Sequence, residues 1–293
     1  MKQNLFVRNS RPLVSKVAYE GNLRESIELS VSLIGGIKKL VNKGDTILLK
    51  PNYNTADPFP GSSDPEFIRT VIGMLYEAGA GKVIVGERTA FLNSRKVLEQ
   101  AGIVKVAEEA GAEVVVFGKD GWHAMFDRKG WRRVKVPAGQ YLHKVSLAKE
   151  ATEIEKIVYV PLIKTHHAAE FIGAIKLSMG FVKPFFDQIT FHARHLQEKL
   201  AELSLVVKPD LIIMEARKAF ITGGPAKGEL REPNLILASG DQVAIDVEGV
   251  KILQSYSGNK LEGKKVWDLI QIRHAVELGL GPHSEEEYEI IAP

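Results

Sequence analysis

Hydrophobic and polar positions follow two recurring patterns along the first part of the chain. Short apolar runs rich in β-branched residues predict buried strands, and longer segments with apolar residues three or four positions apart predict amphipathic helices. The predicted strands cover residues 14–19, 46–49, 82–85 and 113–117, and the predicted helices cover residues 22–41, 64–78 and 97–110. This alternation predicts a doubly wound, mostly parallel α/β sheet with helices on both faces.

The regular alternation stops at residues 121–149. Two segments of alternating polarity flank Pro-Ala-Gly-Gln there, which predicts a β-hairpin insertion. Further strands are predicted at 157–163, 210–214 and 235–238, and further helices at 192–207, from Asp241 onward and at 264–278. No repeat or clear linker divides the chain, so we expect a single α/β domain over residues 1–293.

The stretch from residue 156 to residue 180 concentrates candidate chemistry. Its apolar run, 157–163, predicts a buried parallel strand. The residues directly after this run are polar: Lys164, Thr165, His166 and His167. A second lysine, Lys176, lies between Gly173 and Gly180. Ligands of parallel α/β sheets bind beyond the carboxyl ends of the strands, so we expect a site here.

Composition limits the classes of function. The 293 residues carry a formal net charge of +3 with both signs mixed, which argues against a nucleic-acid or membrane surface. The absence of cysteine excludes a thiol nucleophile and an Fe–S cluster ligated by this chain. No window is long and apolar enough for a transmembrane segment or signal peptide, so we expect a soluble cytoplasmic protein.

Charged or amide side chains also end the other predicted strands. They are Lys50 and Asn52, Glu87, Glu215, and Asp241. In a parallel sheet these ends meet at one edge, so we expect the residues to line a common site with Lys164 and Lys176. Any one of them alone is better explained as a solvated residue flanking a buried strand.

Histidines give a weaker indication of a metal. His192 and His195 are three residues apart, which would place both on one face at the start of a helix. With His166 and a carboxylate such as Glu215 they would form a set of ligands for a divalent metal. A solvated pair at a helix start explains the same spacing, and no carboxylate has a diagnostic position.

Glycine patterns argue against two common nucleotide sites, those for NAD and for ATP. Neither GxGxxG nor GxxxxGK[ST] occurs at a strand-to-helix turn. Gly224 and Lys227 lie in a Gly-Gly-Pro-Ala-Lys-Gly segment that could bind an anion through its backbone N–H groups. The same sequence is also typical of a tight turn.

Taken together, these motifs resemble the family known as domain of unknown function 362. The resemblance covers roughly residues 48–250 and depends on these motifs: Lys50-Pro51-Asn52, Val160 to His166, Gly173-Ala174-Ile175-Lys176 with Gly180, His192, Gly224-Pro225 with Gly228, and Asp241 to Asp246. The chain departs from the family pattern at Leu177, where Asn is usual, and at Glu215-Ala216, where Asp-Gly is usual. Some members carry ferredoxin-type cysteine clusters, so the resemblance implies that a separate ferredoxin-like partner could serve this cysteine-free chain.

The family names no reaction, so function is predicted from the residues. The leading hypothesis is an enzyme for a small anionic metabolite, a carboxylate or a phosphorylated compound. Lys50, Lys164 and Lys176 would neutralise the anion and His166 would act as general acid and base. Asn52, Glu87, Thr165, Gly224, Lys227 and Asp241 complete the predicted substrate-binding set. Two alternatives stay open: a metal-dependent enzyme using His166 with His192 or His195, and a non-catalytic carrier of an anion or metallocofactor that works with a redox partner.

Overall fold

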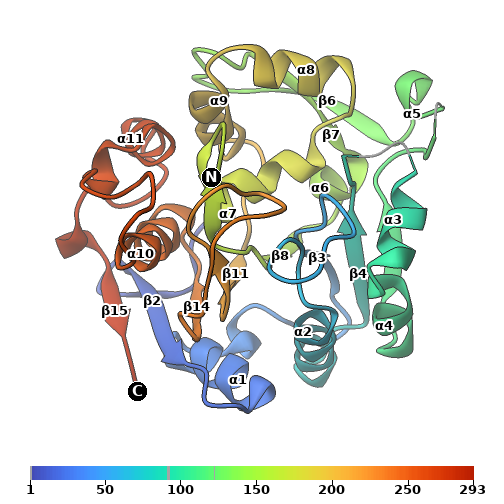
Figure 1. The fold of residues 1–293 in the computed structure, drawn as a ribbon. Coiled ribbons are helices and arrows are strands. Elements are labelled where there is room, and N and C mark those ends of the chain that lie inside the picture. Colours follow the sequence, from blue (N-terminus) through green and yellow to red (C-terminus); the bar gives the residue numbers. More distant parts are fainter. Residues whose placement is uncertain (1, 91–92, 122) are drawn as a thin grey trace.

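The computed structural model describes residues 2–90, 93–121 and 123–293 (Figure 1). A nine-stranded sheet runs through this part of the chain, and β15 pairs with β2 at one side of it. In order, the other strands are β1 (Val7–Arg8), β2 (Arg11–Ala18), β14 (Leu235–Ser239), β11 (Leu211–Ala216), β8 (Lys156–Tyr159), β3 (Thr46–Lys50), β4 (Lys82–Glu87) and β5 (Glu113–Val116), with β15 at Glu289–Ile291. The pairs from β11 through β8, β3 and β4 to β5 are parallel, as are β15 and β2. The sheet is therefore mostly parallel, as the sequence predicts.

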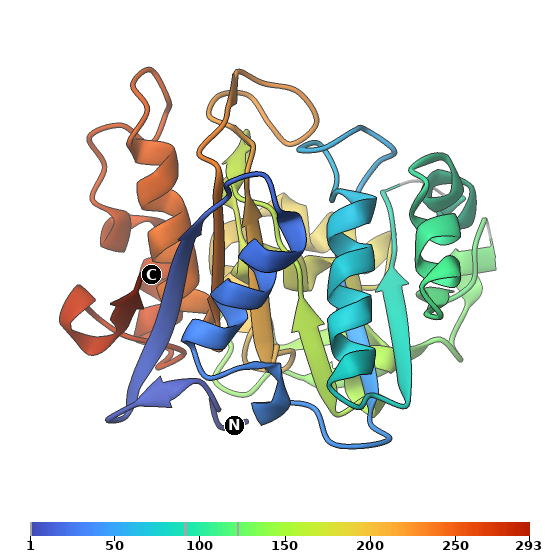
Figure 2. The same cartoon turned by 90° about the horizontal axis from the view of Figure 1, so that it is seen from below.

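Helices cover both faces of this sheet because its strands are apolar on both sides. Ile47 and Leu49 of β3 belong to one buried cluster, and Leu48 between them belongs to the other. The first cluster includes residues of α1 (Leu23–Leu33), α2 (Pro65–Glu77), α3 (Ser94–Gln100) and α4 (Ile103–Glu109). The second includes residues of α6 (Lys149–Glu153), α7 (Ala174–Leu177), α8 (Phe186–Ala193), α9 (Leu196–Leu203), α10 (Gln242–Gln254) and α11 (Ile270–Glu277). Figure 2 shows α1 and α2 in front of the sheet and the yellow helices behind it.

Smaller elements complete the fold. Three two-stranded ribbons are formed by β6 (Trp131–Lys135) with β7 (Lys144–Ala148), β9 (Lys164–His166) with β10 (Glu170–Ile172), and β12 (Ala219–Phe220) with β13 (Leu230–Arg231). The short helices are α5 (His123–Phe126) and the 3-10 turns η1 (Ile37–Lys39), η2 (Ser178–Phe181), η3 (Val266–Asp268) and η4 (Glu285–Glu287). The antiparallel β6–β7 ribbon confirms the hairpin predicted within residues 121–149.

Glycines shorten two of the predicted helices. The helix predicted over residues 22–41 ends at Leu33, because Gly35 and Gly36 have φ values of 115° and 88°, which a right-handed helix cannot include. The helix predicted over 97–110 is divided into α3 and α4 at Gly102, where φ is 77°.

The predicted strand over residues 157–163 is also shorter than expected. Regular pairing in β8 ends at Tyr159, two residues before Pro161, which has no N–H to donate to the ladder. The chain then forms β9, which pairs with β10 instead of continuing the main sheet. Lys164 to His166 therefore lie in a separate small ribbon beyond the end of β8.

The prediction of one helix over residues 192–207 is wrong. His192 lies in the last turn of α8, and α9 begins only at Leu196. His195 lies between the two helices with a left-handed φ of 55°. The two histidines therefore do not share the face of one helix.

The predicted common edge fails at β14. This strand is antiparallel to β11, so Asp241 after its carboxyl end lies at the opposite edge of the sheet from the ends of β3, β4 and β8. Among the described residues, no helix has the length and apolar character needed to cross a membrane.

Candidate anion-binding site

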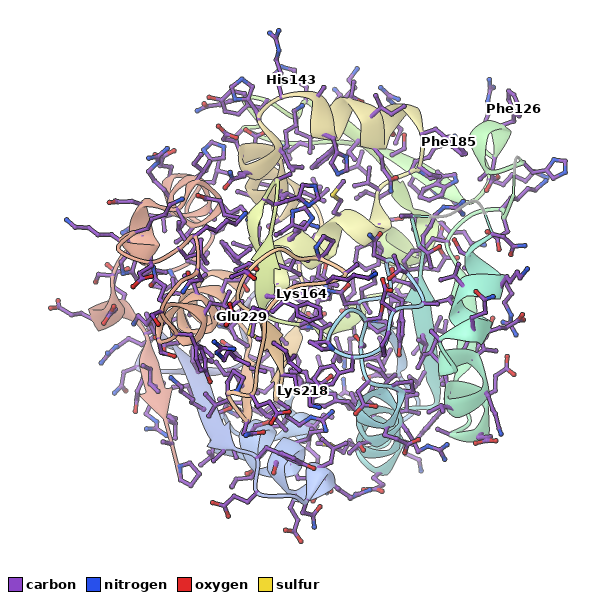
Figure 3. All side chains as sticks on the ribbon, viewed as in Figure 1. Phe126, His143, Lys164, Phe185, Lys218 and Glu229 are labelled. Atoms are coloured by element: carbon purple, nitrogen blue, oxygen red, sulfur yellow. The ribbon has the colours of Figure 1, made fainter. Side chains whose placement is uncertain are left out.

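A pocket of about 190 Å³ lies beyond the carboxyl ends of β3 and β4. Its walls come from these strand ends, from β9 and α7, from α8, and from the loop after β12. Lys164, near the middle of the view in Figure 3, is one of its lining residues. The charged and histidine residues that line it are Lys50, Glu87, Arg88, Lys164, His166, Lys176 and His192. Among the residues that the structure describes, four cationic side chains thus share the pocket with one carboxylate.

Lys50 and Glu87 form an ion pair at the base of this pocket. Lys50 Nζ donates to Glu87 Oε1 at 2.6 Å and to the Pro51 carbonyl at 2.8 Å. The Glu87 carboxylate also accepts hydrogen bonds from the backbone N–H groups of Tyr53 and Arg88, at 2.8 and 2.9 Å. Burial lowers the pKa of Lys50 and raises that of Glu87, while the charge of each partner opposes the shift of the other. The charge of Lys50 is already balanced within the protein.

Lys164 is buried, and its ammonium makes two hydrogen bonds within the protein. Its Nζ donates to the carbonyls of Pro60 and Gly61 at 2.8 and 2.5 Å, and the side chain is 1% exposed. Burial, followed by the charge of Lys176, lowers the pKa of Lys164 to about 7. An ammonium has three N–H donors, so one remains for a ligand.

Lys176 has no internal partner. Within the described residues its ammonium makes no hydrogen bond and no ion pair, although it lines the pocket. Burial and then the charge of Lys50 lower the pKa of Lys176 to about 8. Asp246, fully buried on α10, fixes the start of α7 by accepting from the N–H groups of Ala174 and Ile175 at 2.6 and 3.0 Å. Lys176 is thus an unpaired cation on a helix whose position is set from the core.

His166 is held as a hydrogen-bond donor to the pocket. Its Nδ1 accepts from the backbone N–H groups of Ala168 and Ala169, at 3.1 and 3.0 Å. A nitrogen that accepts two hydrogen bonds carries no proton, so the proton of the neutral ring is on Nε2. Burial and then the charge of Lys176 lower the pKa of His166 to about 2, which keeps the ring neutral. This arrangement opposes the predicted role of His166 as general acid and base, because its Nε2 has no free lone pair.

His192 has the opposite tautomer. Its Nδ1 is 2.8 Å from the carbonyl of Gln188, one helical turn earlier in α8, and a carbonyl can only accept. In the neutral ring Nδ1 therefore carries the proton and Nε2 has the lone pair. His192 is exposed and lines the same pocket as His166. The pocket thus holds one imidazole that donates and one that accepts.

Four residues of the predicted substrate-binding set lie outside this pocket. Thr165 donates its hydroxyl to the Phe220 carbonyl at 3.1 Å, and Lys227 is exposed on the loop after β12. The backbone of Gly224 packs so closely on that of Thr165 that a Cβ there would lie 1.8 Å from the Thr165 carbonyl oxygen. Asp241 caps α10 by accepting from the N–H groups of Val243 and Ala244, both at 2.9 Å. Thr165, Gly224 and Asp241 thus position elements of the fold.

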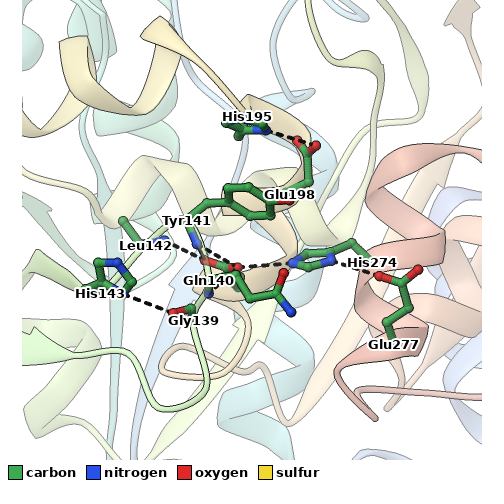
Figure 4. Close-up of polar contacts among 10 residues, drawn as sticks. Gly139, Gln140, Tyr141, Leu142, His143, His195, Glu198, His274 and Glu277 are labelled. Carbon is green, nitrogen blue, oxygen red and sulfur yellow. Dashed lines mark hydrogen bonds and ion pairs between the residues drawn. The ribbon is translucent and has the colours of Figure 1, made fainter.

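Two of the four predicted metal ligands lie apart from the pocket. The ring of His195 stacks on Tyr141 with centroids 4.2 Å apart and pairs with Glu198, outside the pocket (Figure 4). Glu215 is fully buried and accepts from Arg217 Nε at 2.9 Å. Within the ranges that the structure describes, no group of three or more His, Asp or Glu side chains could hold a metal ion. The four predicted ligands therefore do not form one group: His166 and His192 line the same pocket, whereas His195 and Glu215 lie outside it.

Comparison with known proteins identifies the family. The profile of the domain of unknown function DUF362 matches residues 47–251. The chain belongs to the DUF362 family. A thylakoid-associated protein, sll1697, of Synechocystis sp. is 30% identical over 252 residues, which are 83% of this chain and 74% of the relative.

Two solved structures resemble this DUF362 fold distantly. A protein from Thermotoga maritima is 11% identical with a TM-score of 0.47, over 79% of this chain and 57% of that structure. The lactate racemase apoprotein from Thermoanaerobacterium thermosaccharolyticum is 10% identical with a TM-score of 0.47, over 87% of this chain and 59% of that structure. The DUF362 chain thus spans somewhat more than half the length of these structures.

Sequence reasoning missed several residues that line the pocket of this DUF362 protein. Arg88 follows Glu87 directly, and its guanidinium donates to the carbonyls of Phe117 and Lys119 at 2.8 and 2.9 Å. Its position directly after a predicted strand is the signal that could have identified Arg88 as a pocket residue. Gln188 enters from α8, a short helix with no sequence signal that links it to the strand ends.

Proposed function

We propose that this protein is an enzyme that binds a small carboxylate or phosphorylated metabolite in the pocket and moves a proton on it. The observation that carries the proposal is the ammonium of Lys176, which lines the pocket without a partner among the described residues. Lys176 is half-buried, and an ammonium that has lost part of its water without gaining a counter-charge is stabilised by an anion, so we expect an anion to complete the site.

The surroundings of Lys176 favour an anion over any other ligand. Lys164 adds a second cation with a free N–H donor, and Lys50 is neutralised by Glu87. The neutral ring of His166 adds the Nε2–H donor without adding charge. Such preorganised donors stabilise negative charge that develops on a bound oxygen. They are suited to both the carboxylate of a substrate and its enediolate.

We propose His192 as the group that transfers the proton. Its Nε2 lone pair would take a proton from the carbon next to the bound carboxylate, so that the C–H bond breaks and its electron pair enters the enediolate. The resulting imidazolium would return the proton to the same carbon. His166 and the two lysines would hold the enediolate oxygens during both steps. This division of roles separates a donor from a base within one pocket.

Binding is tested by isothermal titration with sulfate and acetate, whose charges are constant between pH 6 and 9. Lys176→Met should weaken binding about 10- to 150-fold, the value of a hydrogen bond to a charged group. Lys105→Met is the matched control, because Lys105 is a highly exposed lysine on α4. Equal affinities of the wild type and Lys176→Met for these anions would refute the anion site.

Proton transfer is tested by NMR of carboxylates incubated with the protein in D₂O. We expect deuterium to appear at the carbon next to the carboxylate of a substrate. His192→Asn should abolish this exchange and leave acetate binding unchanged, whereas His166→Asn should weaken binding as well. If anions bind but a panel of carboxylates shows no exchange, the carrier hypothesis replaces the enzyme. A separate redox partner, such as a ferredoxin-like protein, would then be sought by titration with the loaded protein.

A further inference from the structure

A second, more open depression adjoins the charged pocket. It has a volume of about 600 Å³ and is lined by nine residues, five of which also line the charged pocket. The shared residues are Arg88, Thr89, Ala90, Gln188 and His192. The four that belong to the outer depression alone are apolar: Pro184, Phe185, Ile189 and Ala193. The two spaces therefore share a wall of five residues, with charge in the inner space and apolar surface in the outer one.

Helix α8 forms the boundary between the two spaces. Gln188 and His192, four residues apart, line both spaces. Phe185, Ile189 and Ala193, also at intervals of four, form the neighbouring stripe, which lines only the outer depression. Ile189 is 67% exposed, which is unusual for a large aliphatic side chain. The helix thus presents two different surfaces to one opening.

Phe185 is held in an unfavourable backbone conformation at the edge of the outer depression. Its φ of 68° and ψ of −114° lie outside the regions that residues with a Cβ normally adopt. Conformations of this kind cluster at ligand-binding sites. Figure 3 shows Phe185 in the upper right of the view, where the chain enters α8.

We propose that the ligand of the pocket carries an apolar tail, and that this tail lies in the outer depression against Phe185 and Ile189. The inference depends on the proposed anion site, because the tail is positioned by a head group bound at Lys164 and Lys176. The inner pocket of about 190 Å³ holds only a small head group, and the described residues that line the outer depression alone are all apolar. The class of ligand is an amphipathic carboxylate or phosphate with an alkyl or aromatic group.

The test is a titration series of acetate, butyrate, hexanoate and octanoate against the wild-type protein. Transfer of methylene groups from water to an apolar surface should strengthen binding at least about twofold for each methylene that contacts the depression. Ile189→Ser and Phe185→Gly should remove most of this gain while leaving acetate affinity unchanged. Glycine is compatible with the φ of residue 185, so the second variant should fold.

Two controls separate the tail from the head group. Ile290→Ser changes another exposed isoleucine, on β15, and should keep the wild-type dependence on chain length. Lys176→Met should weaken every carboxylate by the same factor. An affinity that does not depend on chain length, or a dependence that Ile189→Ser leaves intact, overturns the inference while the anion site stands. Failure of acetate and the longer acids alike to bind overturns the proposed function itself.

Discussion

The affinity of the pocket for anions should fall as the pH rises from 6 to 9. Burial lowers the pKa of Lys164 to about 7 and that of Lys176 to about 8. A lysine attracts an anion only when it is protonated, so affinity is highest below pH 7 and decreases through both pKa values. At pH 6 Lys176 is about 99% protonated, and at pH 9 only about a tenth of it remains so.

The size of the change in the dissociation constant follows from the loss of protons by the two lysines. If a bound anion requires both charges, the dissociation constant should rise about tenfold between pH 7 and 8 and approach a hundredfold rise per unit above pH 8. From pH 6 to 9 the limit is roughly a thousandfold. A hydrogen bond to a charged group contributes about 1.5–3 kcal/mol to binding. Loss of the charge on each lysine should therefore lower the affinity by at most about 10- to 150-fold, and the affinity should become constant at high pH once this limit is reached.

Isothermal titration with sulfate at half-unit pH steps measures this profile, because the charge of sulfate is constant over the range. Lys176→Met should leave one titration step, and this step should lie above pH 7 because the charge of Lys176 no longer lowers the pKa of Lys164. The stability of the ligand-free protein should change in the opposite direction. Both lysines have a lower pKa in the folded state than the value of 10.5 in water, so the unfolded state binds more protons and stability rises between pH 7 and 10.5.

A dissociation constant that is constant from pH 6 to 9 would refute the reasoning. So would a Lys176→Met variant with the wild-type profile, since the two cations would then act on different ligands or on none. The variant Lys105→Met, with its exposed lysine on α4, should reproduce the wild-type profile at every pH.

Three further predictions concern the framework of the pocket. His166 should remain neutral with its proton on Nε2 down to about pH 2 in ¹⁵N NMR spectra, and a histidine that titrates near its usual pKa of 6.5 would contradict the assigned hydrogen bonds. Gly180→Ala should lower the free energy of unfolding by about 1–3 kcal/mol and weaken anion binding, because a Cβ would lie 2.7 Å from Lys50 Nζ. The control is Gly73→Ala in the middle of α2, which should raise the free energy of unfolding, measured by chemical denaturation, by up to about 1 kcal/mol. Asp246→Asn should cost about 1–3 kcal/mol of stability and weaken sulfate binding, because one of the two N–H groups at the start of α7 loses its acceptor; unchanged sulfate affinity would show that Asp246 does not position Lys176.

Much of the fold was readable from the sequence because it depends on local patterns. Apolar runs of about five residues between amphipathic segments identified the strands β3, β4 and β5 and their order. The helix predicted over residues 64–78 is α2, which Asp64 caps by accepting from the N–H of Glu66 at 3.0 Å. The hairpin was predicted from two alternating segments around a turn, which is again a local signal.

The sequence also identified the strand-end lysines, but not how their charges are used. Lys50 and Lys164 line one pocket because the parallel strands β3 and β8 end at a common edge, and Lys176 reaches the same pocket from α7. The hydrogen-bond and ion-pair partners of these lysines could not be predicted in the same way. Glu87, which neutralises Lys50, is 37 positions away from it in the sequence. The loop carbonyls that accept hydrogen bonds from Lys164 are more than 100 positions away from it.

Three features of the site depend on the tertiary structure alone. The direction of β14 is set by its antiparallel pairing with both β2 and β11, and this places Asp241 away from the pocket. The tautomers of His166 and His192 are fixed by the backbone groups that face their Nδ1 atoms, N–H groups in one case and a carbonyl in the other. The unpaired state of Lys176 depends on which side chains fail to reach it. Sequence patterns determine which residues are buried and which elements follow one another along the chain, because both follow from local periodicity. They leave open the direction and partner of each side chain, because these depend on atoms that are brought together only when the whole chain has folded.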